Sequence, residues 1–234
     1  MELAIDTSTD SCSIGLSKQG ETIAELTWHS GQSHTVELVP NVVSLLNQNK
    51  TSPQSLTAVF VAKGPGSFNG LRVGMSTAKG LAFSREIPLV GVGTLEVEAF
   101  PYALTGRPIH PVLDAARGEI ASASYRYQQG EWHQLVAEHI ATVDELCRDV
   151  APGAIICGRL PPRLAQEVER QLGGQAIIVK ATLRRAGYLA ELGWRRLQKG
   201  DTDNLATLQP LYLRRPSVTL KTQERKEDNL EKTT

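Results

Sequence analysis

Cysteine is scarce in this chain of 234 residues, which contains only three, and these lie far apart. Cys12, Cys147 and Cys157 are odd in number, and none belongs to a CxxC pair. The sequence therefore offers neither a disulfide framework nor a cysteine zinc site. We expect all three to be small, buried apolar side chains.

Net charge and long apolar runs are missing as well. The 25 Lys and Arg balance the 25 Asp and Glu, so the composition favours no general affinity for nucleic acid or an anionic membrane. No apolar run is long enough to span a membrane, and the first residues have neither the basic flank nor the apolar core of a signal peptide. We expect a cytoplasmic protein with no membrane partner, built as one large domain or two modest ones.

The patterns of a histidine metal site and of a P-loop are also missing. His29 and His34 are five residues apart, and five residues on a helix turn through about 500°, so the two rings would face different ways. We expect no metal site. The glycine-rich stretch 64–67 lacks the Gly-Lys-Ser/Thr ending of a P-loop, because Lys63 precedes its glycines rather than following them.

What the chain does contain is an ordered series of strand-like and helix-like segments. Thr94 is predicted to cap a helix. Pro40 is awkward inside the first helix, so we expect the regular helix to begin near Val39, with Pro40 in its first turn. The predicted segments of the first half are strands at 2–5, 11–17, 22–28, 56–62 and 88–92 and helices at 35–48, 71–84 and 94–104.

The second half repeats this order. Thr142 and Glu145 form a capping box, and a long helix from Thr182 to Lys199 comes later, followed by a short extended segment at 211–213. Its other predicted segments are strands at 109–114, 119–127, 132–140, 154–157 and 176–179 and helices at 142–150 and 162–172.

The repeated order predicts a duplicated α/β architecture with two mixed sheets. We place the first lobe at residues 1–104 and a smaller second lobe at 105–181. Residues 182–216 are expected to return to the first lobe as a helix and a short extended segment. The polar tail at 217–234 has little to bury, so we expect it to be disordered.

The loop after the first strand is the first half of a candidate phosphate site. It contains Asp6, Thr7, Ser8 and Thr9. Carboxylate oxygens suit Mg²⁺, and loop N–H groups suit phosphate, so these residues could hold a nucleotide. The alternative is that they only satisfy a tight turn between strands.

A glycine-rich loop supplies the second half of this candidate site. Gly64, Gly66 and Ser67 could hold an anion with backbone N–H groups at the start of the next helix. The alternative is that the glycines allow a sharp strand-to-helix turn, with Ser67 or Asn69 as the helix cap.

The first two helices have more apolar surface than one sheet can cover, which commonly indicates a second packing surface. The alternative is that each helix is wedged between two elements of its own domain. On the first interpretation, Leu38→Asp or Met75→Glu should disrupt pairing and leave the chain folded. The predicted partner-binding residues are Leu38, Val39, Val42, Leu45 and Leu46 on the first helix and Arg72, Val73, Met75, Thr77 and Leu81 on the second.

Five ordered motifs span the chain from Met1 to about Arg215. They are Leu3–Thr9, Gly64–Gly74, Ala78–Ala82, Asp114–Glu119 and Pro210–Arg214. Together they resemble the TsaB/YeaZ family. Two positions depart from the family pattern, since Asn69 stands where Thr is common and Ala116 where a basic residue is common.

The resemblance implies a degenerate member of the actin, Hsp70 and sugar-kinase fold, with two ribonuclease-H-like lobes whose mixed sheets are flanked by helices. It also implies a non-catalytic scaffold that pairs with TsaD, the paralogous enzyme that transfers a threonylcarbamoyl group to the adenosine beside the anticodon of ANN-decoding tRNAs. TsaE, an ATPase, would join a ternary complex, and TsaC would supply threonylcarbamoyl-adenylate. In the family, the first two helices pack on their counterparts in TsaD, or form a homodimer when the chain is alone.

A rival interpretation is a small-molecule kinase or ATPase that uses Asp6 and the Gly64 loop on a bound nucleotide. The second-lobe loop that would hold the adenine has one glycine, Gly158, beside the bulky Arg159, so we expect no cofactor beyond weak nucleotide binding. Because the net charge is zero, we expect tRNA to be reached through the complex rather than independently. Six arginines could form either a local basic patch or a solvated helix face, namely Arg184, Arg185, Arg195, Arg196, Arg214 and Arg215.

Overall fold

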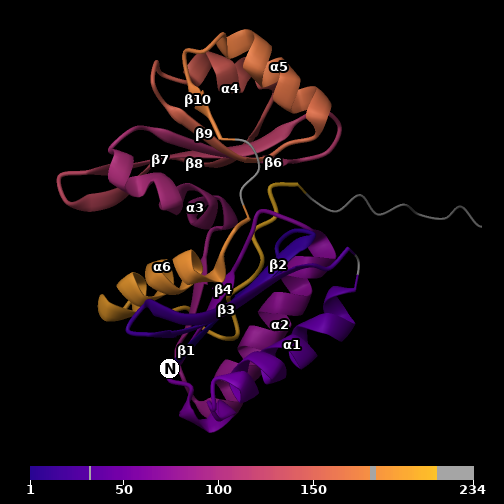
Figure 1. Ribbon diagram of the computed structural model, residues 1–234, viewed down its shortest axis with the longest axis vertical. Coiled ribbons are helices and arrows are strands. Elements are labelled where there is room, and N and C mark those ends of the chain that lie inside the picture. Colours follow the sequence, from indigo (N-terminus) through magenta and orange to yellow (C-terminus); the bar gives the residue numbers. More distant parts are fainter. Residues whose placement is uncertain (32, 180–182, 215–234) are drawn as a thin grey trace, which may run out of the picture.

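The computed structural model describes residues 1–31, 33–179 and 183–214, which form two lobes stacked one above the other (Figure 1). The first lobe holds a mixed five-stranded sheet in the order β3-β2-β1-β4-β5. β2 runs antiparallel to β1 and β3, whereas β4 and β5 run parallel to β1. The strands are β1 (Glu2–Asp6), β2 (Ser11–Lys18), β3 (Glu21–His29), β4 (Ala58–Ala62) and β5 (Leu89–Val92), and a short 3-10 helix, η1 (Pro53–Ser55), precedes β4.

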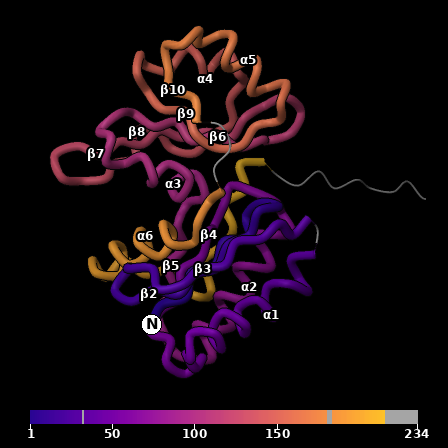
Figure 2. Tube along the Cα trace, viewed as in Figure 1, coloured from indigo at the N-terminus to yellow at the C-terminus, as the bar shows by residue number. Residues whose placement is uncertain are grey.

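Helices cover both faces of this sheet. α1 (His34–Gln48) and α2 (Phe68–Arg85) lie on one face, and α6 (Ala186–Gln198) lies on the other (Figures 1 and 2). Side chains alternate along β1, so Leu3 and Ile5 pack with α1 and α2 while Ala4 packs with α6. The late helix α6 thus packs on the first sheet, although it follows the whole second sheet in the sequence.

The second lobe holds another five-stranded sheet, in the order β10-β9-β6-β7-β8. α4 (Val143–Asp149) and α5 (Pro162–Leu172) cover one face, and α3 (Thr94–Ala99) covers the face turned toward the first lobe. α3 continues as the 3-10 helix η2 (Phe100–Thr105). The strands are β6 (Ile109–Asp114), β7 (Ile120–Gln128), β8 (Glu131–Ala141), β9 (Ile155–Arg159) and β10 (Ile177–Ile178).

The two sheets share one topology. In each, three consecutive antiparallel strands are joined along the first of them by two later, parallel strands. The predicted fold class, two lobes with mixed sheets flanked by helices, is confirmed. The predicted capping box is confirmed too, because the Glu145 N–H donates to Thr142 Oγ1 at 3.2 Å and the Thr142 N–H donates to Glu145 Oε2 at 2.8 Å.

The predicted start of the first helix is wrong. α1 begins at His34 rather than near Val39, and Pro40 lies inside it on an exposed face. His34 is buried, and its Nε2 lies 3.0 Å from the carbonyl oxygen of Thr9. This tertiary contact holds the turn ahead of the proline in the helix, and local preference alone could not indicate it.

Two predicted threonine caps also need correction. Thr94 is the first residue of α3 rather than its cap, which is Gly93. α6 begins at Ala186, because Arg185 is still extended, with φ −104° and ψ 134°. The predicted cap Thr182 and the tail 217–234 lie outside the described residues. Within the described ranges, none of the helices combines the length and apolarity needed to cross a membrane.

Candidate functional site: the cleft between the lobes

β1 ends at Asp6, whose buried carboxylate shapes the loop that follows. Its Oδ1 accepts hydrogen bonds from the backbone N–H of Ser8 at 2.9 Å and from the Ser8 hydroxyl at 2.6 Å. An aspartate that accepts from the residue two positions later stabilises a tight turn. One of the two roles considered for Asp6, satisfying a turn, is thus visible in the structure.

The glycine-rich loop packs directly against this turn. A side chain at Gly66 would place its Cβ 2.1 Å from the carbonyl oxygen of Ser8, so only glycine fits there. The Ser67 N–H donates to that same carbonyl oxygen at 2.7 Å, and the Thr7 hydroxyl donates to the Gly70 carbonyl oxygen at 2.7 Å. The Ser67 hydroxyl accepts from the Gly70 N–H at 3.3 Å and caps α2, as predicted. The glycines therefore allow two loops to touch, and the Ser67 N–H is already used.

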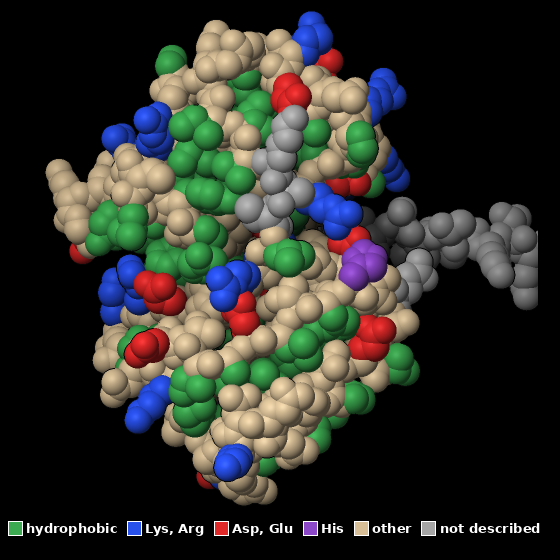
Figure 3. All heavy atoms as spheres, viewed as in Figure 1, with side chains coloured by type: hydrophobic (Ala, Val, Ile, Leu, Met, Phe, Trp, Pro, Cys, Tyr) green, Lys and Arg blue, Asp and Glu red, His purple; other side chains and the backbone are tan. Residues whose placement is uncertain are grey.

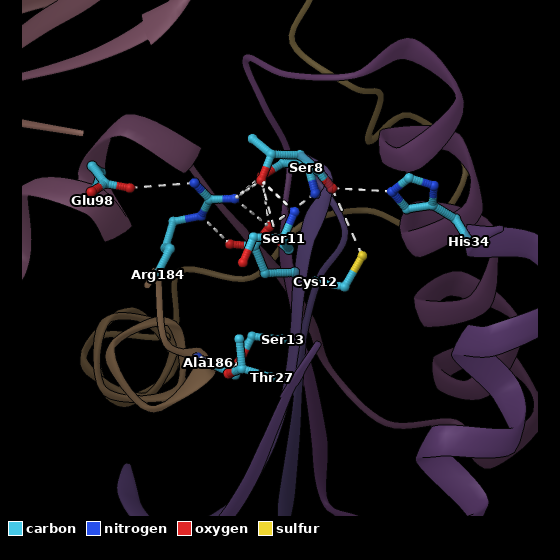
Figure 4. A network of polar contacts seen from close by, with 11 residues as sticks. Ser8, Ser11, Cys12, Ser13, Thr27, His34, Glu98, Arg184 and Ala186 are labelled. Carbon is cyan, nitrogen blue, oxygen red and sulfur yellow. Dashed lines mark hydrogen bonds and ion pairs between the residues drawn. The ribbon is translucent and has the colours of Figure 1, made fainter. Parts of the chain in front are cut away.

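Arg184, just ahead of α6, points toward Ser8 in the turn after β1 (Figure 4). Its guanidinium group forms an ion pair with Asp6 and another, at 3.3 Å, with Glu98 of α3. It also donates to the Ser8 hydroxyl at 2.9 Å and to the Thr9 hydroxyl at 3.0 Å. Figure 4 shows the guanidinium group between Glu98 on one side and Ser8 on the other.

Arg184 is a buried charge that is fully partnered. Its side chain is 4% exposed. Burial alone would lower the pKa of Arg184, but the carboxylates of Asp6 and Glu98 outweigh it and raise that pKa above its usual range. The guanidinium group therefore stays charged and supplies one counter-charge that the two carboxylates share.

The remaining cleft lies between the two lobes and has a volume of about 590 Å³. Arg159, at the end of β9, forms an ion pair with Asp10 across it at 3.5 Å. Gly158 packs on β6, where an added Cβ would lie 2.1 Å from the carbonyl oxygen of Val112. The lining from the two lobes includes Thr9, Ser67, Glu98, Asp114, Arg159 and Arg184.

His29 and His34 contact the loop after β1 rather than each other. His34 contacts the Thr9 carbonyl oxygen from α1, whereas His29 lies 3.7 Å from Asp10 on the other side of the turn. Among the described residues, no group of three or more His, Cys, Asp or Glu side chains is arranged to hold a metal ion.

Half of the predicted partner-binding residues are buried in the first lobe itself. One side of α1 faces the first sheet, and the apolar residues on that side are spaced three and four positions apart. Their side chains pack against side chains of the strands, such as Ile14 and Leu16. They are at most 4% exposed, which corrects the prediction that they meet a partner and that Leu38→Asp leaves the fold intact. The buried residues are Leu38, Val42, Leu45, Leu46 and Met75.

The other predicted partner-binding residues reach the surface to different degrees. Val39 is 52% exposed. Arg72 is exposed and lies over the ring of Phe68, with 4.5 Å between the guanidinium carbon and the ring centroid. The remaining three, Val73, Thr77 and Leu81, are half-buried.

Four exposed apolar residues of these two helices are not among the predicted partner-binding residues, and one of them is Phe68 of α2, which is 37% exposed. Val36 is 70% exposed, Val43 is 48% exposed, and Phe83 on α2 is 76% exposed. Val36, Val39 and Val43 follow each other at helical spacing and form a row that we call the valine row. Figure 3 shows hydrophobic side chains reaching the surface along the lower right edge, over α1.

The arginines considered as a basic patch each have another partner. Arg184 is buried, as described above. Arg185 forms an ion pair with Glu25, Arg195 with Glu191, Arg196 with Asp201 and Arg214 with Glu119. Arg215 lies outside the described residues. The five described arginines therefore do not form an unpaired cationic surface.

Comparison with known proteins finds relatives over nearly the whole chain. Residues 28–217 match the model of the TsaD family, described as tRNA N6-adenosine threonylcarbamoyltransferase. The tRNA threonylcarbamoyladenosine biosynthesis protein TsaB of Bacillus subtilis is 34% identical over 217 residues, which cover 91% of this chain and 93% of that protein.

Solved structures show the same fold. YeaZ from Pseudomonas aeruginosa superposes with a TM-score of 0.75 at 23% identity, covering 91% of this chain and 99% of that one. The activator of 2-hydroxyisocaproyl-CoA dehydratase from Clostridium difficile, solved with bound ADPNP, gives a TM-score of 0.50 at 9% identity over 87% of this chain and 98% of that one. These likenesses place the chain in the fold of actin, Hsp70 and the sugar kinases.

Proposed function

Since this chain belongs to the TsaB/YeaZ family, we propose that it takes part in the biosynthesis of tRNA threonylcarbamoyladenosine as a non-catalytic scaffold that pairs with TsaD. The match of residues 28–217 to the TsaD family model supports this pairing. Two chains of the same fold can present equivalent helices to each other across a near-symmetric interface.

The valine row on α1 is the observation that carries the proposal. Val36, Val39 and Val43 expose 48% to 70% of their surface, while the opposite side of the same helix is buried on the sheet. An apolar row of this kind on a soluble chain is typical of a surface that docks on another helix. The same row can meet its own copy, so we propose that the chain forms a homodimer when TsaD is absent.

The cleft supports a non-catalytic role. Asp6 is the carboxylate that a magnesium nucleotide would need, and it is engaged by Arg184 and by Ser8. Displacing Arg184 would leave the buried carboxylates of Asp6 and Glu98 without their shared counter-charge, which is costly. We therefore propose that the cleft has no resident cofactor, in contrast to a kinase or ATPase of this fold.

The rest of the pathway fits the same proposal. The five described arginines with ion-pair partners leave no unpaired basic surface among them, so tRNA reaches the assembly through TsaD rather than through this chain. TsaE joins as the third member of the complex. The proposed location is the cytoplasm, where tRNA is modified.

The test is size-exclusion chromatography with light scattering of the chain mixed with its TsaD counterpart. The double variant Val39→Asp/Val43→Asp should weaken the heterodimer at least about tenfold, the effect of roughly 1.4 kcal/mol, because it places two charges in an apolar contact. Both side chains are exposed in the monomer, so the fold should persist, unlike with the buried Leu38.

Leu135→Asp is the matched control for this test. Leu135 is 48% exposed, the same fraction as Val43, but it lies on β8 of the second lobe. It should pair as the wild type does. If the double valine variant pairs normally while folded, or if the wild type forms no complex with TsaD, the proposal is wrong, and nucleotide titration of the cleft becomes the next experiment.

A further inference from the structure

We infer that Arg184 is a positioning residue that tethers the two lobes in one relative orientation. The inference does not depend on pairing with TsaD, because it concerns the chain alone. The contacts of Arg184 are distributed over both lobes of the protein.

One set of contacts belongs to the first lobe. Asp6 ends β1, which is the central strand of the first sheet, and Ser8 and Thr9 lie in the turn after it. Arg184 Nε faces Asp6, while Nη2 donates to Ser8 at 2.9 Å and to Thr9 at 3.0 Å. The turn itself is held by the glycine loop and by His34 of α1, so this end of the tether is fixed.

The other contact belongs to the second lobe. Nη1 of Arg184 donates to Glu98 Oε2 at 3.3 Å. Glu98 is on α3, whose neighbours Leu95 and Ala99 pack with Ile109 and other side chains of the second sheet. The Glu98 carbonyl oxygen also accepts from the Cys157 thiol at 3.5 Å, and Cys157 belongs to β9. Glu98 is therefore attached to the second sheet.

The chemistry of the guanidinium group makes the tether directional. All three of its nitrogens are used, and they lie in one rigid plane, so a rotation of either lobe would break several charge-assisted hydrogen bonds together. The side chain is only 4% exposed, so water cannot readily replace those bonds. A lysine could keep the charge, but it lacks the planar fork that serves both lobes at once.

A buried apolar contact also joins the lobes, because Val97 and Phe100 pack with Leu189 and other side chains of α6. A second ion pair across the cleft is more exposed than that of Arg184. The ion pair of Arg159 with Asp10 involves side chains that are 66% and 43% exposed. Exposed pairs contribute little to stability and are screened by salt. The segment 211–214 adds a backbone contact from Leu211 to Lys63 and packs Leu213 with the second sheet. This segment keeps the lobes together when the tether is lost, but it does not supply a buried charge that fixes their angle.

The test is to measure the distance between the lobes by pulsed electron paramagnetic resonance, with one spin label on each lobe. Labels at Asn47→Cys on α1 and Arg148→Cys on α4 report on one lobe each, in a Cys147→Ser background, and both side chains are exposed. The wild type should give one narrow distance distribution. Arg184→Met should give a broader distribution shifted away from that of the wild type.

Arg185→Met is the matched control. Arg185 is the adjacent arginine, but its side chain is 55% exposed, and its partner Glu25 belongs to the first lobe alone. It should keep the narrow distribution of the wild type. If Arg184→Met does not fold, Arg184→Lys decides, since it keeps the charge and loses the fork, and it should also broaden the distribution. A folded Arg184 variant with the wild-type distribution would overturn the inference.

Discussion

Arg184 and Arg185 are neighbours in the chain with opposite surroundings. The Arg184 side chain is 4% exposed and shared between two carboxylates, whereas that of Arg185 is 55% exposed and pairs with one. Removing one partner of a buried ion pair leaves an uncompensated charge, so Arg184→Met should lower the free energy of unfolding by about 3–5 kcal/mol. Arg185→Met should lower it by about 1 kcal/mol or less. Urea unfolding of the two variants measures both values, and equal losses would contradict this account.

His110 on β6 gives a prediction about pH. Burial lowers the pKa of His110, more than nearby Asp149 raises it, and His139 lowers it further. Because the folded-state pKa lies below that of the unfolded chain, the unfolded chain binds the proton first as the pH falls. Stability should therefore be constant well above pH 6.5 and should decrease below it, down through the folded-state pKa.

The measurement for His110 is the free energy of unfolding from pH 7.5 to pH 5, in the wild type and in His110→Gln. Glutamine has no proton to gain in this range, so the variant should lose less stability than the wild type as the pH falls. An equally steep loss in the variant would assign the acid sensitivity to other groups.

At the residue scale, the sequence predicted the loop that contains Asp6, but it did not predict that Arg184 binds this loop. Asp6, Ser8 and Thr9 follow a recognisable strand, and their turn chemistry is local. Arg184 lies 178 residues from Asp6 along the chain. The sequence placed it in either a local basic patch or a solvated helix face, because no local pattern distinguishes a buried arginine from an exposed one.

Two glycines test the packing of whole helices. Gly193 on α6 faces the sheet, and a Cβ there would lie 2.4 Å from the ring of the buried Phe60. A Cβ added at Gly80 on α2 would meet nothing within 4 Å. Alanine favours a helix over glycine by about 1 kcal/mol at either site, so only the contact with Phe60 separates the two substitutions.

Gly80→Ala should therefore raise the melting temperature, whereas Gly193→Ala should lower it, with a net loss of roughly 1–3 kcal/mol from forcing α6 away from the sheet. Differential scanning calorimetry of the two variants gives the sign directly. Stabilisation by both substitutions would show that α6 lies farther from the sheet than described.

At the element scale, periodicity identified the helices but could not choose their faces. Leu38, Val42 and Leu45 form one apolar row on α1, and Val36, Val39 and Val43 form another. Both rows have helical spacing, so the sequence pattern alone does not show which row is buried. In the structure, the first sheet covers the row of Leu38, Val42 and Leu45. The same limit applies to Pro40, which the contact between His34 and Thr9 overrides.

At the scale of the whole molecule, the repeated order of segments was enough to predict two lobes of one topology. Three antiparallel strands followed by alternating helices and strands allow few arrangements, since crossovers between parallel strands have a fixed hand. The relative orientation of the two lobes was not predictable from the sequence. It depends on single long-range contacts, such as those of Arg184 and the ion pair of Arg159 with Asp10.

We propose that this chain contributes a docking surface rather than chemistry to tRNA modification. The most direct measurement is the rate of threonylcarbamoyladenosine formation on tRNA by the TsaD counterpart, reconstituted with TsaC, TsaE and variants of this chain. Val39→Asp/Val43→Asp should lose activity in proportion to lost pairing, whereas Asp10→Asn and Arg159→Gln, at exposed positions in the cleft, should keep the wild-type rate. A cleft variant that pairs normally and yet abolishes the reaction would contradict the account.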